Sequence, residues 1–298
     1  MLLLSRRRLL FCAALYTPIL RTWAAPNVPP TPPGLDAARQ LAQIETTAGG
    51  RLGVTALDTG SGKWLTYRPD ERFPLAGAFT PLLAAAVLAR VEKDQEQLSR
   101  PILFTAADLQ PWAPIARTRL KAGQMTVADL CAAAIQFDDH AAINLLLNSV
   151  GGPTQLTNWL RTQGDDISEI DRFEPELTSA IKGDVRDSST PAMMLKMLNR
   201  FLLSDALAIE SRAQLQAWLV GNGNATTRIR AGLPPEWRVG NATGNGENGT
   251  TNDLAIIWPP EPRAPILLTV WLTDSKATGA VRDAALKEVA RVVFARVA

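Results

Sequence analysis

Hydrophobic and polar residues follow two different periods along this chain, and the periods separate its two ends from its middle. Helical spacing begins near Leu35 and continues through Leu41 and Ile44. Runs typical of buried strands lie at 52–57, 64–67, 254–258 and 266–271. An amphipathic helix is predicted at the C-terminus, over 280–297. Both ends of the chain therefore predict strands flanked by a helix.

The middle of the chain is predicted to be mostly helical. The expected helices span 79–92, 127–135, 141–150, 153–162, 191–203 and 211–220. Strands at both ends with helices between them predict one discontinuous α/β lobe, about 35–70 and 229–298, around an inserted all-α lobe, about 71–228. Together they form one domain over 35–298.

The N-terminal segment has the composition of an export signal. Arginines at 6–8 precede an apolar run, and small residues follow at Ala24 and Ala25. We therefore expect a signal peptide over 1–25, a proline-rich linker over 26–34, and a periplasmic or secreted protein. The paired arginines leave the twin-arginine and the general secretory routes both open.

Composition excludes several classes of partner. The 298 residues are 46% hydrophobic and carry a net charge of +2, so no overall field favours a nucleic acid. After loss of Cys12 with the signal only Cys131 remains, in an apolar run that indicates burial. We expect a monomer with no membrane span after signal removal, no cofactor and no metal; His140 is the chain's only histidine, which excludes a histidine-rich zinc site.

Several ordered segments resemble class A serine β-lactamases over nearly the whole mature chain. These segments are 119–131, 151–153, 171–177, 249–253 and Trp258-Pro259. The last two are most similar to the carbapenem-hydrolysing branch. The resemblance implies the two-lobe β-lactamase/transpeptidase-like fold, an antiparallel five-stranded sheet flanked by helices with an inserted helical lobe.

The resemblance also implies that most catalytic positions are replaced. The family's Ser-x-x-Lys reads Gly77 and Thr80 here, so neither the nucleophile nor the nearby lysine is present. The relay serine of the second motif reads Asp138, and the substrate-orienting asparagine reads His140. The third-motif lysine, a cation that helps hold a substrate carboxylate, reads Ala242.

Other matching positions are retained. Glu174 corresponds to the base that activates the deacylating water, although the family's water-positioning asparagine reads Thr178. The structural residues of the Ω-loop, residues 171–187, match at Arg172, Pro175 and Asp187. Residues implied to bind ligand are Thr243, Gly244, Asn245 and Arg228.

These residues support three hypotheses about function. The first is an exported pseudoenzyme that binds a β-lactam or a peptidoglycan fragment without covalent chemistry, in a cleft expected to be roomier at Gly77; within it, a product of a decaying gene with no ligand stays open. The second is a β-lactamase or another hydrolase that uses Glu174 and Asp138, with His140, and no covalent serine. The third is a protein-interaction role for the surface.

Overall fold

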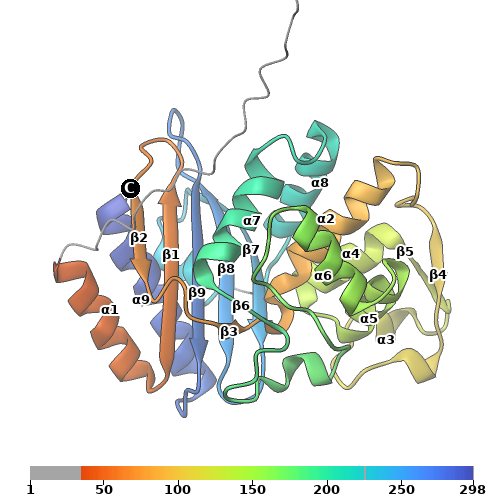
Figure 1. Ribbon diagram of the computed structural model, residues 1–298, viewed down its shortest axis with the longest axis horizontal. Helices are drawn as coiled ribbons and strands as arrows, with labels where there is room; N and C mark the ends of the chain where they lie inside the picture. The colour runs from red at the N-terminus through yellow and green to blue at the C-terminus, as the bar shows by residue number, and fades with distance from the viewer. Residues whose placement is uncertain (1–34, 225, 298) are drawn as a thin grey trace, which may run out of the picture.

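A five-stranded antiparallel sheet and a bundle of helices stand side by side in the computed structural model, which describes residues 35–224 and 226–297 (Figure 1). The sheet runs in the order β2-β1-β9-β8-β7, and each neighbouring pair is antiparallel. The two-lobe fold expected from the sequence is therefore confirmed. The expected signal, 1–25, and linker, 26–34, lie outside the described residues.

The strands and helices have the following bounds. The strands are β1 (Arg51–Asp58), β2 (Trp64–Tyr67), β3 (Phe73–Pro74), β4 (Pro101–Leu103), β5 (Gln124–Thr126), β6 (Ser188–Ser189), β7 (Arg238–Asn245), β8 (Thr251–Trp258) and β9 (Ile266–Thr273). The α-helices are α1 (Leu35–Ala48), α2 (Thr80–Val91), α3 (Ala116–Arg119), α4 (Val127–Phe137), α5 (His140–Ser149), α6 (Pro153–Thr162), α7 (Pro191–Leu203), α8 (Ile209–Val220) and α9 (Gly279–Val297). The 3₁₀ turns among the described residues are η1 (Ala76–Phe79), η2 (Ala106–Asp108), η3 (Glu176–Ser179) and η4 (Ile229–Gly232).

Apolar side chains of each inner strand point alternately to the two faces of the sheet, so a hydrophobic core lies on each face. In β9, Leu268 and Val270 belong to the cluster beneath α1 and α9, whereas Leu267 and Trp271 belong to the cluster shared with the helical lobe. Successive side chains of a strand point to opposite faces, so a strand covered on both sides reads as a continuous apolar run. This explains why the predicted strand 266–271 contains so few polar residues.

The helix α2 runs through the middle of the helical lobe. Its residues 80–88 are all buried, because neighbouring helices cover it on every side. The sequence predicted this helix over 79–92, and the structure adds η1 directly before it. Gly77 in η1 and Thr80 at the start of α2 are thus fixed within the core.

Predicted and observed elements agree in type at both ends of the chain and through the middle. The main omission is β7, which the sequence did not predict although it holds Ala242, Thr243 and Gly244. Glycine and asparagine are poor strand formers, so local preference gave no signal there. Cys131 is buried as expected. Among the helices described, none is long and apolar enough to cross a membrane.

Truncation of a core residue in the central strand is expected to destabilise the protein. Leu268→Ala removes a fully buried side chain from the α1–α9 face, and we expect it to lower the free energy of unfolding by about 2–5 kcal/mol. Leu103→Ala is the matched control, since Leu103 is 76% exposed. Urea denaturation followed by circular dichroism measures both; equal midpoints for the two variants would contradict the assignment of the core.

Candidate functional site

The turn that carries Gly77 is held against the sheet by contacts to the backbone of the turn. Asn252 Nδ2 in β8 donates to the carbonyl oxygens of Pro74 at 2.9 Å and Leu75 at 3.0 Å. A Cβ placed on Gly244 of β7 would lie 2.8 Å from both Ala78 N and Leu75 O, closer than real Cβ contacts allow. The missing side chain at Gly244 thus permits β7 to lie directly against η1.

The carboxyl group of Asp138 fills the space beside Gly77. A Cβ placed on Gly77 would lie 1.8 Å from Asp138 Oδ1 and 2.5 Å from its Cγ. The sequence suggested a roomier cleft at Gly77, and that expectation is wrong. The Asp138 carboxyl group takes the space that a side chain at position 77 would need, so Gly77 and Asp138 are sterically matched.

Helix α4 ends at Asp138, and this ending aims the side chain. Asp138 adopts the left-handed conformation, φ 52°, at the C-cap of α4, and its N–H donates to the carbonyl of Ala133. Aspartate is among the few residues other than glycine that adopt this conformation readily. The next residue, Asp139, then caps α5 by accepting from Ala142 N–H at 3.0 Å.

Burial dominates the electrostatics of Asp138. Loss of water raises its pKa to about 7, although the Asn245 N–H and the charge of Arg228 act in the opposite direction. Only 7% of the residue is exposed, and among the described residues its Oδ1 has no hydrogen-bond partner. A carboxyl group in this state exchanges its proton near neutral pH.

Glu174 is the second buried carboxyl group of the cleft. Burial, and next the charge of Asp138, raise its pKa to about 8. Thr178 Oγ1 donates to Glu174 Oε2 at 2.9 Å, whereas Oε1 has no partner among the described residues. Thr178 therefore takes over one polar contact at the position where the family has an asparagine.

Asn144 fastens the Glu174 segment to α5, and the sequence analysis did not identify it. Its Nδ2 donates to the Glu174 carbonyl at 2.9 Å, and its Oδ1 accepts from Glu174 N–H at 2.8 Å. The available signal was its spacing of four residues from His140, which places both on one face of α5.

His140 lies next to Glu174, but the contact is weak. His140 Nδ1 is 3.7 Å from Glu174 Oε2, beyond hydrogen-bonding distance. Burial lowers the pKa of His140 to about 4 despite the charge of Asp139. The imidazole is therefore neutral at neutral pH and provides no cation to either carboxyl group.

The residues suggested to bind ligand on β7 have different surroundings. Ala242 and Thr243 are buried, with Ala242 fully enclosed, and Gly244 is pressed against η1. Only Asn245 is exposed, at the end of the strand. The cleft wall here is thus mainly backbone, which leaves Asn245 N–H and Thr243 as its polar groups.

Arg228 is engaged by protein groups rather than open to a ligand. It is 8% exposed; its Nε donates to Asp283 Oδ1 at 2.8 Å and its Nη1 to the carbonyl of Asn252 at 3.0 Å. Its Nη2 donates to the side chain of Asn245. The one cationic anchor expected to survive in the cleft is largely neutralised by Asp283.

The Ω-loop is closed at its base. Arg172 Nε donates to Asp187 Oδ2, and Asp187 Oδ1 accepts from the N–H groups of Asp171 at 2.8 Å and Arg172 at 3.1 Å. The peptide bond between Glu174 and Pro175 is cis. The loop thus has the internal contacts that hold Glu174 towards η1.

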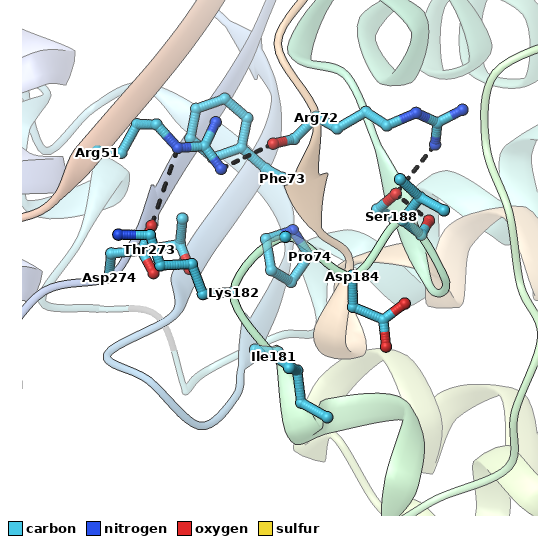
Figure 2. Close-up of a pocket in the computed structure, with 13 residues that line it drawn as sticks. Arg51, Arg72, Phe73, Pro74, Ile181, Lys182, Asp184, Ser188, Thr273 and Asp274 are labelled. Carbon is cyan, nitrogen blue, oxygen red and sulfur yellow. Dashed lines mark hydrogen bonds and ion pairs between the residues drawn. The ribbon is translucent and has the colours of Figure 1, made fainter.

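A cavity of about 300 Å³ lies elsewhere, between the second half of the Ω-loop and β3 (Figure 2). Arg51 lies over the Phe73 ring, 4.1 Å from its centroid, and Arg72 donates to Ser188 Oγ at 2.9 Å. Both arginines are thus engaged in contacts within the protein. Neither Asp138 nor Glu174 lines this cavity. We place the candidate site at the two carboxyl groups because they combine burial, missing partners and altered pKa values.

Possible metal ligands are not grouped in the part of the chain that the structure describes. Within 35–224 and 226–297, no group of three or more His, Cys, Asp and Glu side chains is arranged to hold a metal ion. The chemistry available is that of two neighbouring carboxyl groups, which can exchange protons or accept hydrogen bonds.

Comparisons with known proteins agree with this architecture. Residues 36–297 match the model of the Beta-lactamase enzyme family. The chain is 46% identical over 255 residues to the Carbapenem-hydrolyzing beta-lactamase KPC of Klebsiella oxytoca, covering 84% of this chain and 86% of that one. It is 41% identical to Beta-lactamase AST-1 of Nocardia asteroides, covering 97% and 95%.

A solved structure extends the similarity to three dimensions. An ancestral (GNCA) class A β-lactamase superposes with a TM-score of 0.85 at 50% sequence identity. The match covers 87% of this chain and 99% of that one. Sequence and fold therefore point to one family.

Steric matching of Gly77 and Asp138 predicts strong coupling between substitutions at the two positions. Gly77→Ala should destabilise the protein by about 1–3 kcal/mol, because the new methyl group overlaps the carboxyl group. In an Asp138→Gly background the same change should cost little, whereas in Asp138→Asn, which keeps the size, the cost should persist. Urea denaturation of the three backgrounds, each with and without Gly77→Ala, measures the coupling. An equal loss of unfolding free energy in all three would refute the steric match between Gly77 and Asp138.

The pH dependence of stability should reveal the buried carboxyl groups. Burial raises the pKa of Asp138 to about 7 and of Glu174 to about 8, above their values in an unfolded chain. The folded protein therefore binds these protons more tightly, and the stabilisation they confer at low pH is lost as the pH rises through 7 and 8.

The measurement is the free energy of unfolding at about pH 6.5 and about pH 8.5, where neutral His140 contributes little change. The wild type should lose more stability across this interval than the Asp138→Asn, Glu174→Gln double variant. Asp253, whose pKa burial raises to about 7, is common to both proteins. Identical losses would show that neither carboxyl group retains a proton near neutrality.

Proposed function

Since this chain belongs to the class A β-lactamase family, we propose that it is an exported β-lactamase-like protein that binds a small ligand without forming an acyl-serine intermediate. The ligand class is a β-lactam or a peptidoglycan fragment, and the compartment is the periplasm or the exterior. The fold, the Ω-loop and the backbone of β7 support a binding cleft.

One observation carries the proposal: the Asp138 carboxyl group occupies the place of a side chain at position 77. Gly77 offers no nucleophile, and Thr80 offers no amine to accept its proton. In another serine hydrolase, loss of the nucleophile or its base alone lowers turnover on the order of a millionfold. The residue types at 77 and 80 and the space taken by Asp138 therefore support a function that involves no acyl-enzyme at Gly77.

A second candidate is hydrolysis by the two carboxyl groups, favoured by their pKa values near neutrality. An ionised Glu174 would take a proton from water as that water attacks the lactam carbonyl, and a protonated carboxyl group would return a proton to the lactam nitrogen as its bond to carbon breaks. Glu174 is ionised mainly above its pKa of about 8. The second acid, Asp138, is protonated mainly below its pKa of about 7, so this route predicts turnover with a maximum between about pH 7 and about pH 8 that disappears in Glu174→Ala.

We expect the purified protein to form no covalent adduct with a chromogenic cephalosporin and to hydrolyse it no faster than Glu174→Ala. Mass spectrometry detects the adduct, and absorbance detects the hydrolysis. Gly77→Ser alone should also stay unacylated, since Asp138 overlaps the new side chain and Thr80 supplies no base. Rapid acylation of that single variant would contradict this account.

Restoring the chemistry should require four changes together. Gly77→Ser, Thr80→Lys, Asp138→Ser and Ala242→Lys return the family's residues to a cleft whose Ω-loop contacts are intact. We expect the quadruple variant to acylate measurably. If it folds but never acylates, the cleft differs from the family's at further positions.

A further inference from the structure

The cavity between the second half of the Ω-loop and β3 is open to solvent (Figure 2). Its volume of about 300 Å³ is at the lower end of the range of small-molecule sites. Ile181 and Val185 line it from the Ω-loop and are 51% and 59% exposed. Small solutes therefore have direct access to this wall, which no part of the proposed function uses.

Part of the cavity wall is apolar. Pro74 of β3 contributes to it, together with Ile181 and Val185. Figure 2 shows Pro74 and Ile181 between Asp274 on one side and Asp184 on the other. Apolar side chains beside a hollow lose contact with water when the apolar part of a ligand covers them, and this favours binding. The wall therefore suits a ligand that carries a small apolar group.

The two carboxylates that line the cavity already have cationic partners. Asp184 pairs with Arg186 at 2.8 Å and with Arg172 at 3.7 Å, and neither arginine lines the cavity. Asp274 Oδ2 lies 4.0 Å from Arg51 Nε. A cationic ligand would therefore have to compete with arginines of the protein for both carboxylates.

The cations that line the cavity are less fully compensated. Lys182, exposed on the Ω-loop, forms no ion pair with a carboxylate of the described residues. Arg72 donates to two neutral oxygens, Ser188 Oγ and the carbonyl of Ile167. The wall thus carries an excess of positive charge, which favours an anion.

Arg51 retains donors for such an anion. Its Nη1 donates to Glu71 at 3.2 Å and its Nη2 to the carbonyl of Arg72 at 2.8 Å, whereas its Nε is too far from Asp274 to donate to it. A guanidinium group has further N–H donors beyond these two. Figure 2 shows Lys182 on the same side of the cavity as Arg51 and Asp274.

The nearby carboxylate limits the charge of the ligand. Asp274 lines the cavity beside Arg51, so each negative charge on a ligand is attracted by Arg51 and Lys182 but repelled by Asp274. A carboxylate carries a single charge and two acceptor oxygens, which suit an ammonium and a guanidinium group together. A phosphate dianion meets twice the repulsion and has no apolar part for Pro74 and Ile181.

We propose that this cavity binds a small amphiphilic carboxylate, with its anionic group at Lys182 and Arg51 and its apolar part against Pro74 and Ile181. The bound ligand joins the second half of the Ω-loop to β1 and β3. The site is separate from the cleft at Gly77, and the inference goes beyond the proposed function without depending on it.

The test uses sodium benzoate as the probe, titrated into the purified protein and followed by ¹H–¹⁵N NMR at constant ionic strength. We expect saturable shifts at the amides of Gly183 and Asp274, with a dissociation constant on the order of 1 mM for so small a ligand. Benzamide, which has the same shape without the charge, and inorganic phosphate should cause no saturable shift. Affinity for benzoate should decrease as the ionic strength is raised.

Two variants should change the affinity in opposite directions. Lys182→Met keeps most of the side chain but removes its charge, and we expect it to weaken benzoate binding about threefold to tenfold. Asp274→Asn keeps the size, and asparagine also adopts the left-handed conformation found there, φ 58°. It should strengthen binding about twofold to fivefold, because the repulsion is removed. Lys121→Met, at an exposed lysine outside the cavity, is the matched control and should bind as the wild type does.

Four results would overturn the inference. They are no saturable shift from benzoate, an equal shift from benzamide, unchanged affinity in both Lys182→Met and Asp274→Asn, and shifts confined to Gly77 and Asn245, which would place the benzoate in the cleft. Because the readout is confined to the cavity, any of these results leaves the proposed function of the cleft unchanged. Acylation of the protein by a cephalosporin would refute that function and leave this inference unchanged.

Discussion

The contact between β7 and the turn at Gly77 constrains the whole cleft. Gly244 lies so close to the backbone of η1 that no side chain fits between them, and Asn252 fastens the start of the same turn to β8. These contacts hold the backbone at Gly77 in place, so it cannot move into the space that a side chain at this position would occupy. The filling group comes from the opposite side, at the end of α4.

Asp138 supplies that group, and its place has an electrostatic consequence. A carboxyl group enclosed by η1 and β7 loses its water, so its pKa rises towards neutrality. The pKa of Glu174 is raised to about 8, first by burial and next by the charge of Asp138. Protonation allows the protein to bury both carboxyl groups without a neighbouring cation.

The scaffold around the pair has kept its order. Asp187 closes the base of the Ω-loop, Asn144 binds the backbone of Glu174 on both sides, and Asp139 caps α5. These contacts hold Glu174 in place whether or not an acyl-enzyme forms nearby. The 46% identity to one relative and the TM-score of 0.85 to a solved structure agree with this retained scaffold.

The sequence by itself determined the elements whose pattern is local. Continuous apolar runs predicted the inner strands, helical spacing predicted α2 and α5, and motif order predicted the fold. It also singled out Gly77, Asp138 and Glu174 as candidate site positions. It did not reveal β7, because its Gly- and Asn-containing residues favour a strand only when β8 and η1 lie beside them.

Only the tertiary structure decided how these residues meet. Gly77 and Asp138 are 61 positions apart, and nothing local shows that one fills the space of the other. The pairing of Arg228 with Asp283, 55 residues away, likewise changes an apparent ligand anchor into an internal ion pair. The sequence gives the type of each residue. The space around a side chain, its dielectric surroundings and its charge partners depend on how distant segments pack, and these determine the chemistry of the cleft.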